Sequence, residues 1–136
     1  MKRTFVVKNS HKKTRYTVGF LILSQFNFAI SQTAPNALPT GGQVVAGSAT
    51  ISQTQTATSA TMNINQTSQR AVVNWDSFNV GKNAQVNFNQ PNSSAATLNR
   101  VTGASASMID GAIRANGQVV LVNPNGVTFG KGAEIN

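Results

Sequence analysis

Few residues in this sequence are able to do acid–base, nucleophilic or metal chemistry. It contains no cysteine, and its single histidine, His11, lies in a basic N-terminal run. The rest of the chain therefore cannot form a Ser-His-Asp or Cys-His nucleophile system, or a zinc site of cysteine and histidine. The only acidic residues are Asp76, Asp110 and Glu134. Glycoside hydrolysis normally needs two placed carboxylates, and two of these three occupy turn-like positions. We expect no enzyme activity, no metal, no cofactor and no small-molecule substrate.

One short motif does have a physical role that can be read from its residue types. In Asn123-Pro124-Asn125-Gly126, the proline presets φ for the second position of a type I turn, and asparagine and glycine suit the next two positions. The side chain of Asn123 can accept a hydrogen bond from the turn backbone. The motif predicts a tight turn, and on its own it would suit any β-protein.

The charge of the chain is unevenly distributed. The formal net charge is +8, but six of the eleven basic residues lie within the first fifteen. From Gln32 onward, five basic residues face three acidic ones, so the net charge is only +2. Phosphate contacts dominate nucleic-acid affinity, and this part of the chain has too few cations to make many of them. The sequence therefore excludes a nucleic-acid partner.

The N-terminus has the three-part pattern of a secretory signal peptide. A basic region spans residues 1–15, an apolar stretch follows from Tyr16 to Leu23, and a weaker apolar tail ends at Ile30. Small residues at Ala29 and Ser31 predict cleavage after Ser31, before Gln32. The alternative is a membrane anchor, but the apolar run is shorter than the ~20 residues that span a bilayer. We expect a signal peptide at residues 1–31 and a linker at residues 32–42.

The rest of the chain, residues 43–136, is expected to be all-β. Polar uncharged residues alternate with Val, Ile, Leu and Phe, and no stretch has the pattern of an amphipathic helix. Turn signals recur at short intervals along the chain, which fits a sandwich or a parallel β-helix. The expected strands cover Val44–Val45, 48–58, 60–66, 71–75, 78–80, 85–89, 97–101, residues around Ile109 and Ile113, 118–122 and 127–129.

Two internal similarities favour the stacked β-helix. Residues 78–87 resemble residues 127–136, and residues 85–92 resemble residues 118–125. The two pairs of segments have different spacings along the chain, so there is no strict repeat. They are typical of strands that meet similar turns in successive turns of a solenoid. Because the chain stops within a strand without a polar cap, we expect it to be the N-terminal piece of a longer protein.

The order of the motifs resembles a known family. Trp75-x-x-Phe78 comes first, then Asn99-Arg100-Val101, then Ile109-x-Gly111, and finally Asn123-Pro124-Asn125-Gly126. This succession is similar to the N-terminal two-partner secretion domain of filamentous haemagglutinin-like and high-molecular-weight-adhesin-like exoproteins of Gram-negative bacteria. A second family motif, N-P-N-L, has no clear match, and Asn89–Asn92 is the nearest sequence.

The resemblance implies a fold, a partner and a route. The fold is an all-β, right-handed parallel β-helix (solenoid), of which this chain is the N-terminal portion, with small extra-helical strands. The partner is an outer-membrane β-barrel transporter with periplasmic POTRA domains, reached after export by the inner-membrane Sec machinery. The implied function is to direct a large adhesin or toxin to the cell surface or the medium. The alternative is that the domain itself binds carbohydrate or a cell surface.

Each singled-out residue also has a structural interpretation. Trp75, Phe78, Phe88 and Phe129 are expected to fill the core. The motif Asn123, Pro124, Asn125, Gly126 serves either folding of the turn or contact with the transporter. Asn99 and Arg100 serve either local structure, which we favour, or partner recognition. Haem capture is disfavoured because no His or Cys follows His11. Asn65 and Asn92 begin glycosylation-type sequons.

Overall fold

The computed structural model describes residues 5–9 and 33–136. The predicted cleavage point between Ser31 and Gln32 lies outside these residues, as does most of the predicted signal peptide. The described residues contain strands and no helix, and hence no apolar helix of the length that a membrane crossing requires. Polar and apolar residues that alternate with a period of two, many of them Thr and Val, favour this all-strand structure.

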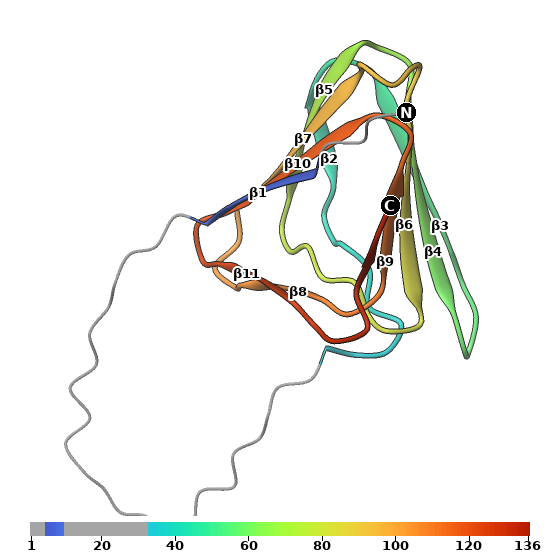
Figure 1. Ribbon diagram of the computed structural model, residues 1–136, viewed down its shortest axis with the longest axis vertical. Coiled ribbons are helices and arrows are strands. Elements are labelled where there is room, and N and C mark those ends of the chain that lie inside the picture. Colours follow the sequence, from blue (N-terminus) through green and yellow to red (C-terminus); the bar gives the residue numbers. More distant parts are fainter. Residues whose placement is uncertain (1–4, 10–32) are drawn as a thin grey trace, which may run out of the picture.

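The chain winds into a β-solenoid of about three turns, whose stacked strands form three sides (Figure 1). The first side stacks β4 (Ala60–Gln66), β6 (Ala84–Asn89), β9 (Ala112–Ala115) and β12 (Glu134–Ile135) in parallel. The second stacks β5 (Arg70–Trp75), β7 (Ala96–Val101) and β10 (Gln118–Asn123). The third pairs β8 (Ser107–Ile109) with β11 (Val127–Phe129). This architecture confirms the expected parallel β-helix.

Three further strands lie at the two ends of the stack. β2 (Gln43–Ala46) runs antiparallel to β5, and β3 (Ala49–Gln55) runs antiparallel to β4. They cover the edge of the first turn, where backbone groups would otherwise lack partners. At the other end, β1 (Phe5–Asn9) pairs in parallel with β10, in register from Phe5 opposite Val119. The small extra-helical strands implied by the resemblance are therefore present.

The core lies inside the three sides. Within each strand the buried residues alternate with more exposed ones, as in β4, where Met62 and Ile64 face inward while Thr61 and Asn63 face outward. The sequence 78–80, expected to be a strand, makes only one isolated bridge, from Val80 to Ile109. The rest of that corner is shaped by residues 33–40, which pack along it, with Leu38 joining the core.

The first internal similarity marks equivalent places in the solenoid, and the second does not. Val80 and Phe129 both lie opposite Ile109, so they occupy the same position two turns apart, as the similarity of their segments suggests. By contrast, residues 85–89 belong to β6 and residues 118–122 to β10, which lie on different sides. The second similarity therefore reflects two strands with similar inward residues, and not a repeated turn of the solenoid.

One corner requires a glycine. A Cβ atom at Gly111 would lie 2.1 Å from the carbonyl oxygen of Gly81 and 2.4 Å from that of Ala84. Gly111→Ala is therefore expected to lower the free energy of unfolding by about 2 kcal/mol, the usual cost of overpacking. Denaturant unfolding measures this loss. Gly132→Ala is the control, because its Cβ would meet only the Asp110 carbonyl oxygen, at 3.3 Å. Equal losses in both variants would contradict the explanation.

Candidate functional site

The predicted turn at the end of β10 is present and is closed by its own side chains. The backbone N–H of Gly126 donates to the carbonyl oxygen of Asn123 at 3.0 Å, which closes the four-residue turn. The Asn123 Oδ1 accepts the backbone N–H of Asn125 at 2.9 Å. Gly126 has a φ of 106°, a conformation that other residues rarely adopt. These residue types are those that the turn needs.

The same motif ties the third turn of the solenoid to the loop that precedes β8. Asn123 is fully buried, and its Nδ2 donates to the carbonyl oxygen of Ser105 at 3.0 Å and to Ser107 Oγ at 2.9 Å. The Nδ2 of Asn125 donates to the carbonyl oxygen of Gly103 at 2.9 Å. Asn123 is therefore part of the buried structure, whereas Pro124 and Asn125 are exposed at the corner.

The first two residues of the Asn-Arg-Val sequence lie on opposite faces of β7. Asn99 is buried, accepts the indole N–H of Trp75 at 2.9 Å and donates to the carbonyl oxygen of Val120 at 3.3 Å. Arg100 is exposed, and its Nε donates to Asn74 Oδ1 at 3.0 Å. Asn99 therefore connects three neighbouring strands inside the solenoid, while only Arg100 is available at the outer surface.

Three of the four expected core aromatics are buried. Trp75, Phe78 and Phe88 are each at most 2% exposed, and the rings of Trp75 and Phe78 meet edge to face, with centroids 5.5 Å apart. The expectation for Phe129 is wrong, because its side chain is 41% exposed. Phe129 lies on β11, an edge strand of the two-stranded sheet that β11 forms with β8. It is thus covered less than its counterpart Val80, which lies two turns further in.

A buried polar network, which we did not expect from the sequence, lies at the corner between the first and second sides. The Nε2 of Gln90 donates to Thr97 Oγ1 at 3.0 Å and to the carbonyl oxygen of Gln118 at 2.8 Å, and Thr97 in turn donates to Gln66. The side chains of Gln66, Gln90 and Thr97 are all buried. The alternation of the sequence could have indicated this network. Gln66 and Gln90 lie two residues after the inward-facing Ile64 and Phe88, so they also occupy inward positions.

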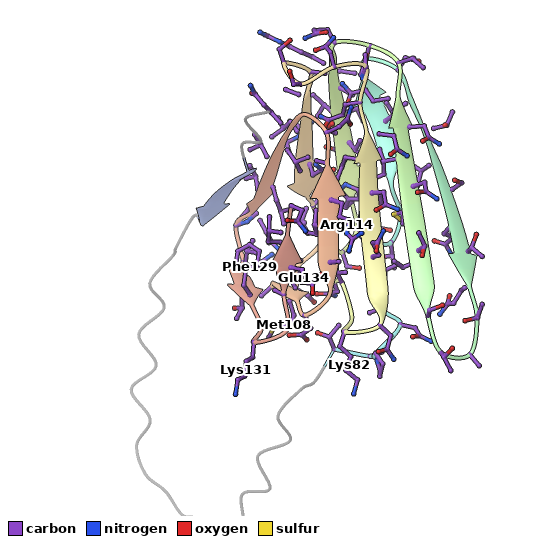
Figure 2. All side chains as sticks on the ribbon, turned by 45° about the vertical axis from the view of Figure 1, so that its right-hand side comes forward. Lys82, Met108, Arg114, Phe129, Lys131 and Glu134 are labelled. Atoms are coloured by element: carbon purple, nitrogen blue, oxygen red, sulfur yellow. The ribbon has the colours of Figure 1, made fainter. Side chains whose placement is uncertain are left out.

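A hollow lies at the opposite end of the strands, beside β8 and β11. Its volume is about 770 Å³, and its lining includes Lys82, Met108, Asp110 and Lys131. Figure 2 shows that Lys82 and Lys131 extend from the same end of the solenoid, away from the strands. The motif residues Asn123–Gly126 do not line this hollow. The hollow therefore does not join the predicted motif to a binding pocket.

Comparison with known families decides what kind of domain this is. The family described as the TPS secretion domain matches residues 36–136. The chain belongs to the TPS secretion domain family. This match covers most of the chain, and it includes every motif on which the resemblance to two-partner secretion exoproteins depended.

Similar proteins agree with this family. This chain is 40% identical over 119 residues to a heme/hemopexin-binding protein of Haemophilus influenzae strain ATCC 51907 / DSM 11121 / KW20 / Rd, and 41% identical over 119 residues to another protein of that name from Haemophilus influenzae. Each match covers 88% of this chain, but only 13% and 12% of the relatives. The crystal structure of the HMW1 secretion domain from Haemophilus influenzae matches with a TM-score of 0.62 and 39% identity, over 72% of this chain and 25% of that one.

The few ionisable groups of the TPS domain are dispersed over its described part. Asp76 follows β5, Asp110 lies between β8 and β9, and Glu134 lies on β12. Glu134 is within 3.8 Å of Arg114, in an exposed pair. No three His, Cys, Asp or Glu side chains of residues 5–9 and 33–136 are grouped so that they could hold a metal ion.

Proposed function

We propose that this chain is the secretion-targeting module of a large exoprotein, an adhesin or a contact-dependent toxin. The observation that carries the proposal is the TPS family match over residues 36–136, together with an intact Asn-Pro-Asn-Gly turn. The chain spans only 13% of the length of one of these relatives and 12% of the length of the other. Their named binding activity is therefore not transferred to this domain.

The proposed partner is an outer-membrane transporter with periplasmic POTRA domains. A signal peptide at residues 1–31, cleaved between Ser31 and Gln32, would first deliver the chain through the Sec machinery to the periplasm. Extended segments such as those that form β4 and β6 are rich in polar and apolar residues in alternation. Unfolded, they offer backbone groups for strand addition to the transporter. Pro124, Asn125 and Arg100 are exposed in the folded domain, and Asn99 and Asn123 become accessible only before folding.

Folding outside the cell completes the proposed mechanism. Each solenoid turn pairs its backbone with the turn before it, as β7 pairs with β5 and β10 with β7. A completed turn therefore presents an edge on which the next turn forms. Stepwise folding on the outer side hinders backward sliding of the chain. No step in this mechanism requires a catalytic residue, and the proposal assigns the domain no enzyme activity.

The test is the dependence of secretion on the transporter. We expect the exoprotein in the culture medium or on the cell surface when the cognate transporter gene is present. When that gene is deleted, the amount outside should fall at least tenfold, and the chain should accumulate in the periplasm or be degraded there. Equal amounts outside in both strains would refute the proposal.

A further inference from the structure

The strand β3 forms one border of the five-stranded sheet on the first side of the solenoid (Figure 1). It pairs with β4 along one edge, in an unbroken antiparallel register from Ala49 opposite Gln66 to Gln55 opposite Ala60. Within the described part of the chain, no other strand pairs with β3, and no backbone hydrogen bond from another segment reaches residues 49–55. The second edge of β3 therefore presents a row of unpaired backbone N–H and C=O groups.

This edge lacks the features that usually prevent strand pairing between molecules. Natural proteins protect an exposed edge with charged side chains, a proline, a β-bulge or a very short strand. The strand β3 is seven residues long, and its register with β4 contains no shift. Residues 49–66, which form β3 and β4, include no charged residue and no proline. The edge of β3 is therefore open to pairing with another strand.

The other edge strand at the same end of the solenoid, β2, is protected. It has only four residues, and a register shift between Val44 and Ala46 interrupts its pairing with β5. Both strands cover the first turn, so covering that turn does not by itself require a long, regular and uncharged edge. The contrast between the two strands points to a partner for β3 that β2 does not have.

The strand β3 is held in its extended shape before any partner arrives. At the tip of the hairpin that joins β3 to β4, the Nδ2 of Asn36 donates to the carbonyl oxygens of Thr56 and Ala57, at 3.3 and 3.2 Å. Within the strand, the side chain of Ile51 is partly buried and packs against the hydrophobic core. Because the strand is already ordered, its pairing with another strand costs little conformational entropy.

The sequence of β3 is complementary to itself when two copies run antiparallel. With Ser52 at the centre, Thr50 of one copy lies opposite Thr54 of the other, and Ser52 lies opposite Ser52 of the other copy. These three residues are the exposed, outward-facing positions of the strand. Opposed threonine and serine hydroxyls form favourable cross-strand hydrogen bonds. The absence of charge on the strand also means that two copies do not repel each other at this edge.

We propose that the folded domain binds a second copy of itself by antiparallel pairing of the two β3 strands. Both copies use the same strand, so the interface is isologous and its twofold axis passes beside Ser52. The pairing joins the two sheets that contain β3 into one continuous sheet, with the solenoids end to end. One pair of strands buries less area than a stable interface does, so we expect a dissociation constant of roughly 100 µM. This association is independent of the proposed secretion role.

Cysteine cross-linking tests the register of this pairing. The chain has no cysteine, so Ser52→Cys carries a single thiol at the residue that meets its own copy. Directly opposed Cβ atoms in antiparallel strands are about 4.5–5.5 Å apart, and a small adjustment allows a disulfide. Under mild oxidation, we expect a covalent dimer of Ser52→Cys and none of Asn65→Cys, whose thiol would be exposed on β4, one strand away from the edge. Equal cross-linking of the two variants, or none in either, would overturn the proposal.

Sedimentation equilibrium tests the association without a cross-link. The apparent mass of the 136-residue chain should rise from one copy toward two as its concentration passes roughly 100 µM. Ser52→Lys places two like charges opposite each other and should weaken the association at least tenfold. Asn65→Lys is the matched control, because it adds the same charge away from the edge, and its affinity should stay within threefold. If Ser52→Lys does not fold, Thr54→Lys takes its place on the same exposed edge. A mass of one copy at ten times that concentration, or association that a folded lysine variant on β3 leaves unchanged, would overturn the proposal.

Discussion

Trp75→Ala is expected to lower the free energy of unfolding by about 4 kcal/mol, as for large aromatic side chains removed from a core. Trp75 is 1% exposed and packs edge to face on Phe78. Its indole N–H is also the donor to Asn99 Oδ1, at 2.9 Å. The substitution therefore leaves a cavity and a buried acceptor without its partner. Since domains are stable by only about 5–15 kcal/mol, much of the variant should unfold at moderate urea concentration.

The matched control for this prediction is Trp75→Phe. It keeps most of the ring volume but removes the indole N–H, so the loss should be about 2 kcal/mol, part of which is the unsatisfied acceptor. Asn99→Val in the phenylalanine background should then cost less than Asn99→Val in the native chain, because the two residues are coupled. Additive effects in this double-mutant cycle, measured by urea unfolding, would contradict the role assigned to the hydrogen bond.

Asn123→Ala is expected to lower the free energy of unfolding by about 3 kcal/mol, because each buried polar group left without its partner costs about 1–3 kcal/mol. The substitution removes the donors to Ser105 and Ser107 and the acceptor for the Asn125 backbone N–H. Urea unfolding measures the loss, and hydrogen exchange at residues 103–107 should locate it.

Asn125→Ala is the control within the same motif. Asn125 is exposed, and the substitution removes mainly the hydrogen bond from its side chain to the Gly103 carbonyl oxygen. We therefore expect the free energy of unfolding to fall by about 1 kcal/mol or less. Secretion should follow the same order, with Asn123→Ala reduced most. If Asn125→Ala or Pro124→Ala abolished secretion while the folded domain kept its stability, the result would mean that the transporter contacts these exposed turn residues directly.

Local pattern predicted most of the strands. The alternation of Met62, Asn63, Ile64 and Asn65 identified β4 at its observed bounds, and the run from Gln85 to Asn89 identified β6 apart from its first residue. The failure at residues 78–80 has a physical cause. Val80 makes one bridge, to Ile109, and hydrogen bonds join the residues on either side of the segment, 76–77, 81 and 83, to Pro35, Ala37 and Thr40. Those contacts join parts of the chain that are distant in sequence, which periodicity does not report.

The residues of the Asn-Pro-Asn-Gly motif illustrate the same limit at the site. Turn chemistry was sufficient to predict the bend and the bond within the motif from Asn125 to Asn123. It could not supply the partners Ser105 and Ser107, which lie well before the motif in the chain and become its neighbours only when the third turn stacks on the second. The exposure of Phe129 likewise depends on which strand covers β11, and no local pattern of apolar residues carries that information.

A gain-of-function measurement tests the central claim most directly. Residues 1–136 are fused to a periplasmic reporter enzyme that has no route of its own across the outer membrane, and the fusion is expressed with and without the cognate transporter. We predict reporter activity in the medium only when the transporter is present, and its loss when residues 36–136 are deleted and the N-terminal segment is kept. Equal reporter activity in the medium without the transporter, or after that deletion, would contradict the assignment of this domain to secretion targeting.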